Sequence, residues 1–149
     1  MRTIERNIVG TFLISSDAKI LLGQSVKGGV YQGVWCVPGG GIEPDETNLE
    51  AARRETLEEA NVDILDESIE LDTFPSYGQS QKTLPESGEQ VLVKMNFINY
   101  IVRFQRPSKD IPFEDGDDLM NLKWHSLADL PNIKITSAMT DVLKRHGYL

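Results

Sequence analysis

One stretch of the chain decides its fold and its chemistry: residues 39–62, which run GGGIEPDETNLEAARRETLEEANV. Three glycines open it, and the residues from 47 to 60 have the composition of a helix. Asp45 or Thr47 suits the N-cap, and Glu50 stands three residues after Thr47, as a capping box requires. Asn61 tolerates the left-handed backbone that often ends a helix. The stretch therefore predicts a sharp turn followed by a helix over 47–60.

One face of this predicted helix suits the core, and its border is acidic. At about 100° per residue, four residues that we expect to face the core gather in one stripe: Leu49, Ala52, Thr56 and Ala60. Glu55 lies three residues from Glu58 and four from Glu59, so the three carboxylates are neighbours beside that stripe. Because like charges at this spacing destabilise a helix, we expect a positive group between them.

Two interpretations fit these carboxylates. Arg54 precedes Glu58 by four residues and can pair with it, but one guanidinium cannot neutralise three carboxylates. A divalent cation can, and an oxygen donor set without His or Cys favours Mg²⁺ or Mn²⁺ over Zn²⁺. The plain alternative is a solvated acidic helix face, which is common in proteins.

The preceding glycines make the cation site the more specific interpretation. Residues 39–41 carry no Cβ, so their backbone can approach a ligand beside the start of the helix. The order along the chain is Gly40, five residues, Glu46, seven residues, Arg54-Glu55, two residues and Glu58-Glu59. Chance is a poor explanation for so many positions at fixed spacing.

With these residues the chain resembles the Nudix hydrolase family, whose signature box spans residues 40–62 here. Residues 35–40, WCVPGG, and 122–124, LKW, also look like family features. Two positions depart from the box, Thr56 where an aliphatic residue is usual and Asn61 where Gly is usual. Asn is the next-best residue for a left-handed helix end, and Thr56 keeps a methyl group toward the core. We therefore expect a small effect on stability and none on the chemistry.

The resemblance implies an enzyme that hydrolyses a nucleoside diphosphate linked to another group, with a divalent cation bound at the box. The implied metal ligands are the carbonyl of Gly39 and the carboxylates of Glu55, Glu58 and Glu59. Arg54 would orient these glutamates, and Glu46 would support the loop. The general base stays open: Glu58 is favoured within the box, and the candidates in the loop over 106–117 and just after it are Asp118 and Glu114, ahead of Asp115 and Asp117.

The substrate is less determined than the reaction. Backbone groups of Gly40 and Gly41 can contact it, and aromatic rings can stack on a base: Tyr31 and Tyr77 above all, with Trp35, Phe74 and Phe97 as further candidates. We favour a nucleoside triphosphate, modified or not, because the chain is short and keeps its glutamates. The alternatives are a nucleotide sugar of the GDP-mannose type, ADP-ribose, a dinucleoside polyphosphate, and a Nudix-like module that binds nucleotide without hydrolysis.

The remaining elements favour an α+β fold. We expect a hairpin over 7–24 that turns at 15–18, and a helix over 137–146. Further extended segments are expected at 34–37, 62–65, 69–74, 91–104 and 119–125, with loops at 75–90 and 106–117. Strands and helices do not alternate regularly, which indicates a mixed β-sheet flanked by helices. The resemblance names this a Nudix-type α/β/α sandwich.

Composition restricts the class of protein. The 149 residues suit one domain, 1–149, and the net charge of -8 argues against binding to nucleic acid. Cys36 is the only cysteine, so an internal disulfide is excluded. No signal peptide or membrane span is apparent, so we expect a cytoplasmic protein with a small nucleotide as partner and no membrane contact. The resemblance leaves a homodimer open.

Overall fold

The computed structural model describes residues 1–25 and 33–149. In chain order the elements are β1 (Arg2–Ile14), β2 (Lys19–Ser25), β3 (Trp35–Cys36), β4 (Gly39–Gly41), α1 (Asn48–Ala60), β5 (Ser68–Leu71), β6 (Ser76–Thr83), β7 (Gln90–Arg103), the 3₁₀ helix η1 (Ser108–Asp110), β8 (Leu119–Ser126), the 3₁₀ helix η2 (Leu127–Asn132) and α2 (Ser137–Arg145). No helix in these described ranges is both long and apolar enough to cross a membrane.

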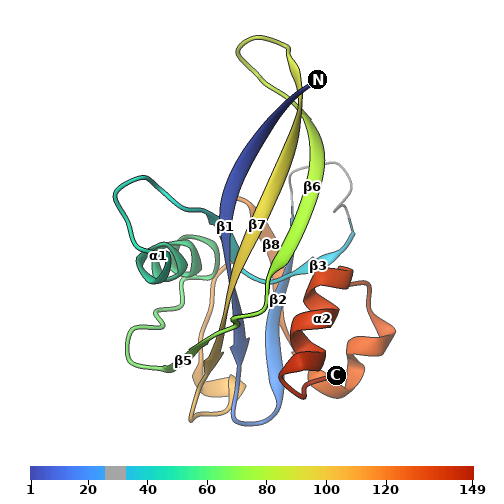
Figure 1. Cartoon of the computed structure of the whole chain (residues 1–149). Helices are drawn as coiled ribbons and strands as arrows, with labels where there is room; N and C mark the ends of the chain where they lie inside the picture. The colour runs from blue at the N-terminus through green and yellow to red at the C-terminus, as the bar shows by residue number, and fades with distance from the viewer. Residues whose placement is uncertain (26–32) are drawn as a thin grey trace.

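The strands form one mixed sheet, which confirms the expected α+β architecture. Its order is β3-β2-β1-β7-β5, with β4 beside β1, β6 beside β7 and β8 beside β2. β1 runs parallel to β7 over its whole length, whereas the other pairs are antiparallel. α1 and α2 lie on opposite sides of the sheet (Figure 1). The sheet is therefore the middle layer of the predicted α/β/α sandwich.

Each helix covers a separate core because neighbouring residues of a strand face opposite sides. On one side, Val9 packs against Ala51 and Ala52 of α1. On the other side, Phe12 and Ile101 pack in the cluster that contains the buried face of α2. Even-numbered residues of β1 and odd-numbered residues of β7 thus face α2 in this part of the sheet, and their neighbours face α1.

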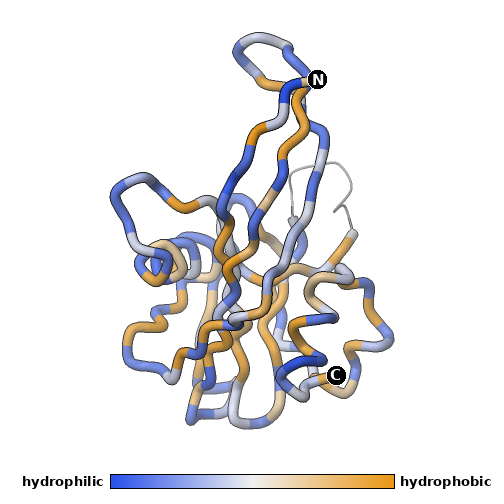
Figure 2. Tube along the Cα trace, in the orientation of Figure 1, coloured by the Kyte–Doolittle hydropathy of each residue, from blue (hydrophilic) through white to orange (hydrophobic). Residues whose placement is uncertain are grey.

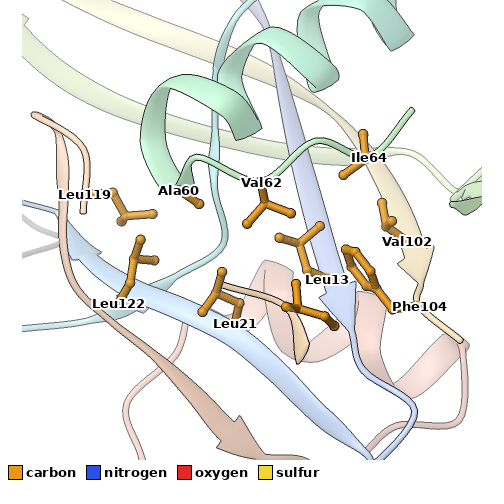
Figure 3. Packing of buried hydrophobic residues seen from close by; sticks show 10 residues of the cluster. Leu13, Leu21, Ala60, Val62, Ile64, Val102, Phe104, Leu119 and Leu122 are labelled. Atoms are coloured by element: carbon orange, nitrogen blue, oxygen red, sulfur yellow. The ribbon is translucent and has the colours of Figure 1, made fainter. Parts of the chain in front are cut away.

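Residues 62–65 do not form the strand that their apolar character suggested. Val62 and Ile64 are buried, but no strand pairs with them in the described part of the chain. Figure 3 shows Val62 close to Leu13, and Ile64 close to Val102 and Phe104. The segment is apolar because its side chains fill the core at the end of α1.

A second correction concerns residues 75–90, where we expected a loop and the structure has β6. This strand pairs with β7 from Ser76↔Phe97 to Thr83↔Gln90. Together with the start of β1 it projects beyond the two helices (Figure 1), and Figure 2 shows it in hydrophilic and pale colours. An edge strand that buries little carries a weak apolar pattern, so its sequence looked like a loop.

The other boundaries agree with expectation to within a few residues at most of their ends. The hairpin turns at 15–18, with Ala18 at φ 59°, and the predicted terminal helix is α2. β1 starts at Arg2, five residues before the predicted 7, because β7 pairs with it from there. β5 ends at Leu71, earlier than the predicted 74.

Candidate active site

The ends of α1 are fixed by its own sequence. Thr47 is the N-cap: its hydroxyl accepts a hydrogen bond from Glu50 N at 3.1 Å, and the Glu50 carboxylate accepts one from Thr47 N at 2.9 Å. Asn61 ends the helix at φ 55° and donates its backbone N–H to Leu57 O at 3.0 Å. Both predicted caps are confirmed, and they fix where the glutamates of the last turns stand.

Small residues let α1 approach the sheet closely. Its buried residues are Ala51, Ala52, Thr56 and Ala60. The expected inward Leu49 is wrong: this side chain, in the first turn of α1, is exposed, whereas Ala51 is buried in the cluster that contains Val9 of β1. The Thr56 hydroxyl lies 2.6 Å from Ala52 O and 2.8 Å from the Thr11 hydroxyl of β1, so the departure at position 56 is accommodated by hydrogen bonds.

The glycine turn packs between β1 and α1. β4 pairs with β1 through Gly39↔Gly10, Gly40↔Val9 and Gly41↔Ile8. A Cβ on Gly40 would collide with the Glu55 carboxylate, and one on Gly39 would collide with Val9 O. Only glycine permits this contact between the turn and the helix.

Two of the three predicted metal-binding glutamates lie against this turn. Glu55 is 13% exposed and contacts Gly40, and Glu59 accepts a hydrogen bond from Gly39 N at 3.0 Å. Glu58 is different, because its side chain is 59% exposed. The structure thus places Glu55 and Glu59 at the glycines and leaves Glu58 open to solvent.

Arg54 connects these groups. Its Nη1 donates to Glu55 at 3.0 Å and to Glu58 at 3.3 Å. Its Nη2 and Nε donate to the two oxygens of Glu46 at 2.6 and 3.0 Å, and Nη2 also reaches Gly41 O at 3.0 Å. One guanidinium therefore ties the loop before α1 to the carboxylates of the helix.

The surroundings shift the pKa values of Glu46 and Glu55 in opposite directions. Hydrogen bonds from Arg54 hold the pKa of Glu46 at about 2. Burial raises the pKa of Glu55, and the charges of Glu58 and Glu46 add to this, although Arg54 opposes it. The pKa of Arg54 is raised, first by its hydrogen bonds to Glu46. Glu55 is thus a carboxylate whose charge is incompletely compensated by its surroundings.

The loop over 106–117, which carries Glu114 and is followed by Asp118, lies at the last turn of α1. A Cβ on Gly116 would approach Glu58 O at 2.6 Å and Glu59 Cα at 2.8 Å, so this loop touches the helix backbone there. Glu114 accepts a long hydrogen bond, 3.4 Å, from Asn61. Glu114 and Asp118 therefore belong to a segment packed beside the box glutamates, as a base supplied by a loop requires.

The predicted metal site has suitable donor atoms that are not yet gathered around one point. Among the residues that the structure describes, no group of three His, Cys, Asp or Glu side chains is arranged to hold an ion. Arg54 occupies one oxygen of Glu55 and lies at Glu58. The hard oxygen donors suit Mg²⁺ or Mn²⁺, and the glycine at position 40 leaves the Glu55 carboxylate room beside the turn. The donor set therefore fits a divalent ion.

The predicted aromatic contacts are separate from this cluster. Tyr31 lies outside the described residues. Tyr77, 70% exposed on β6, lines a shallow hollow of about 460 Å³ together with Gln79 and Lys94. A second hollow of about 430 Å³ runs along the loop over 41–46, and Glu5 lines both.

Sequence reasoning missed one polar residue near the turn. Asn99 lies in the second half of β7, directly across β1 from Gly39 by register, and is 7% exposed. A polar residue inside the apolar run FINYIV was the signal that could have identified it.

Comparison with known proteins agrees with this geometry. A family model described as NUDIX domain matches residues 5–146. An RNA pyrophosphohydrolase of Bradyrhizobium sp. is 36% identical over 86% of the chain and 82% of its own length. The nucleoside triphosphatase NudI of Escherichia coli is 27% identical over 97% and 99%.

Solved structures share the fold. The NUDIX domain of NrtR from Shewanella oneidensis, crystallised with ADP ribose, superposes with a TM-score of 0.67 at 17% identity, covering 96% of this chain and 86% of that one. A MutT structure from work on Aliivibrio salmonicida and Vibrio cholerae gives 0.64 at 20% identity, covering 95% and 96%.

Proposed function

The chain belongs to the Nudix family and is a hydrolase of diphosphate bonds, and from this premise we propose that it cleaves a nucleoside triphosphate with the help of a divalent cation. One observation carries the proposal: the acidic face of α1 is packed against the glycine turn, with Glu55 at Gly40 and Glu59 at Gly39. A solvated acidic helix face would not explain why a largely buried carboxylate lies against a residue that must be glycine.

The residues that would hold the cation are Glu55, Glu58 and Glu59, with the carbonyl of Gly39. The ion would be Mg²⁺ or Mn²⁺, because all four donors are oxygens. When bound, it would neutralise charge on the phosphate oxygens and lower the pKa of a water molecule.

The other proposed roles are positioning of the glutamates and deprotonation of the attacking water. Arg54 holds Glu55 and Glu58 in place by hydrogen bonds, and Glu46 fixes Arg54 from the other side. Glu58 is the proposed general base, because its carboxylate is exposed to the water that it must deprotonate. Glu114 and Asp118, in the loop packed against the end of α1, are the second choice.

Substrate contacts are proposed in two places. Backbone groups of Gly40 and Gly41 would contact the phosphates, since no side chain stands in the way. Tyr77 would stack on a base that reaches the hollow at β6, and Tyr31 remains a prediction.

A free nucleotide is favoured over a nucleic acid. The Escherichia coli relative, which matches over 97% of the chain, is named a nucleoside triphosphatase, and the charge of -8 repels a polyanion. A nucleotide sugar, ADP-ribose and a 5′-triphosphate RNA are the alternatives, the last because one relative is named an RNA pyrophosphohydrolase.

A substrate panel tests the proposal. Release of phosphate and pyrophosphate is measured from nucleoside triphosphates, GDP-mannose, ADP-ribose and a 5′-triphosphate RNA, each with Mg²⁺, with Mn²⁺ and with EDTA. We expect turnover of a nucleoside triphosphate that EDTA abolishes. Turnover that survives EDTA contradicts the metal, and binding without turnover of any compound favours a non-catalytic module.

Two further expectations stay predictions. A cytoplasmic location is tested by cell fractionation, and a homodimer by light scattering of the purified chain at several concentrations.

A further inference from the structure

Asn99 is a buried amide that the fold itself does not use. Its side chain makes no hydrogen bond to any residue that the structure describes, although the residue is only 7% exposed. The buried hydroxyls of Thr11, Thr56 and Ser108 all have partners. Placing a polar group in the interior without such a partner costs stability, so its presence calls for another explanation.

The amide is not completely sealed from solvent. Among the described residues, the one side-chain polar atom that is both sealed from solvent and without a partner is Nε2 of His125. The amide atoms of Asn99 are therefore not sealed. A small molecule that reaches this part of the sheet can hydrogen-bond to them.

Position relates Asn99 to the glycine turn. Gly39 pairs with Gly10, and Gly10 pairs with Asn99, so the three residues form one row across β4, β1 and β7. Neighbouring strands lie about 4.8 Å apart, which puts Asn99 roughly 10 Å from Gly39. The two positions before Asn99 in this row have no side chains. A ligand that lies along the row meets the amide as its first side chain.

Gly10 also shapes the setting of the amide. A Cβ at Gly10 would lie 2.9 Å from Asn99 Oδ1 and 3.3 Å from Val37 Cγ2. The amide therefore leans over Gly10, on the side of the sheet where Phe12 and Ile101 face α2. Among the strands that the structure describes, β4 pairs with β1 alone, and its glycines contact Glu55 and Glu59.

We propose that the Asn99 carboxamide hydrogen-bonds the nucleoside part of the substrate whose diphosphate lies at Gly39, and so contributes to selecting the base or sugar. This inference rests on the proposed function, because the glycine turn is where the diphosphate must lie. The distance of two strand spacings between Gly39 and Asn99 matches the separation of a nucleoside from its diphosphate, whereas a further phosphate would lie much closer to the turn. A neutral group that both donates and accepts also matches a base edge or a ribose better than a phosphate.

The next residue along the row does not compete for this role. Asp72 N donates to Asn99 O, which places Asp72 beside Asn99. Its carboxylate is already bound by Arg145 at 2.6 Å and by His146 at 3.2 Å. Asn99 is therefore the hydrogen-bonding side chain of the row that remains for a ligand.

The test compares the wild type with Asn99→Leu, which has nearly the same shape and no hydrogen-bonding group. We expect a melting temperature that does not fall, because no intramolecular bond is lost. KM for the best substrate of the panel should rise about tenfold, the value of one lost hydrogen bond, with a smaller change in kcat. Asn99→Ser keeps a donor and an acceptor, so its KM should lie between those of the wild type and Asn99→Leu.

Ser108→Ala is the matched control. This buried hydroxyl donates to Asp17 at 2.8 Å, so its removal should lower the melting temperature and leave KM unchanged. An unchanged KM in Asn99→Leu overturns the proposal. A lower melting temperature together with a KM that Asn99→Ser does not improve also overturns it, because that result describes a structural residue.

Failure of the proposed function is recognised separately, since it appears as absence of turnover in the wild type. In that case the same variants are compared by the rise in melting temperature that ADP produces. A rise in the wild type that Asn99→Leu loses supports the contact. An equal rise in both proteins, or none in either, contradicts it.

Discussion

The two helices cover the same sheet and are built for different ends. α2 buries large side chains, Met139, Val142 and Leu143. α1 buries alanines and one threonine, which contribute less apolar area but allow a close approach to β1 and β4. The difference indicates that α2 mainly stabilises the fold and that α1 mainly positions its polar side chains.

Their charges show the same contrast. α2 ends in Lys144 and Arg145, as the helix dipole favours, and Arg145 pairs with Asp72 at 2.6 Å. The last turn of α1 carries Glu58 and Glu59 and no basic residue, which the dipole disfavours. A helix that keeps such an unfavourable arrangement does so at a cost in stability, and the proposed cation is what would offset it.

The largest expected effect separates the glutamates of α1 by position. Glu58→Gln should lower turnover about a thousandfold, the range for loss of a general base, with little change in the unfolding free energy. The control on the same helix is Glu50→Gln, which keeps the capping box because Gln can take that place. Steady-state kinetics of both variants decide the matter, and equal activities would show that Glu58 has no special role.

For stability, in contrast to turnover, α2 should matter more than α1, and truncating one leucine on each helix tests this. Leu143→Ala on α2 removes a fully buried side chain and should cost about 3 kcal/mol of unfolding free energy. Leu57→Ala on α1 removes a partly exposed one and should cost less than about 1 kcal/mol. Urea unfolding measures both values, and similar losses would mean that α1 is as important to the core as α2.

A third prediction uses pH to isolate the ion pair at the end of α2. Burial opposes ionisation of Asp72, but hydrogen bonds from Arg145 and His146 outweigh it and lower its pKa below the ordinary 3.8. The stabilisation is therefore complete above that value and is lost as the pH falls through the lower pKa of the folded protein. Asp72→Asn should cost about 2 kcal/mol at neutral pH. In urea titrations the gap between the two proteins should narrow in acid, and a gap independent of pH would refute the linkage.

The smallest expected effect concerns the buried hydroxyl pair between α1 and β1. In Thr56→Val the Thr11 hydroxyl keeps one hydrogen-bond partner among the described residues, the backbone oxygen of Pro38 at 3.4 Å. The substitution should lower the unfolding free energy by about 1 kcal/mol. Replacing both threonines by valine also removes the Thr11 hydroxyl, which is left with only this long hydrogen bond, and should restore most of the loss. Turnover should stay at the wild-type level throughout; a drop in turnover would mean that the pair also positions the glycine turn.

Local signals explain which parts of this structure were predictable. Thr47, Glu50 and Asn61 determine the ends of α1 through contacts within a few residues, so the sequence alone was sufficient. The strand β6 depends on pairing with β7, and its exposed polar residues show no apolar alternation. Its existence could not be deduced from residues 76–83 themselves.

In the candidate site too, features set by local spacing were predictable and features set by tertiary packing were not. Spacing placed the glutamates on one face of a helix, but the exposure of Leu49 and the partners of Arg54 depend on how β1 and the loop over 41–46 pack. Asn99 was missed because its significance lies in a row across three strands, which appears only when the register is known.

The most direct test of the central claim, that the acidic face of α1 is a cation site, is the melting temperature of the wild type and of Glu55→Gln with and without millimolar Mg²⁺. Burial raises the pKa of Glu55, so neutralising it should leave the metal-free variant at least as stable as the wild type. Mg²⁺ should raise the melting temperature of the wild type alone. Equal responses of the two proteins to Mg²⁺, or none in either, would contradict the account.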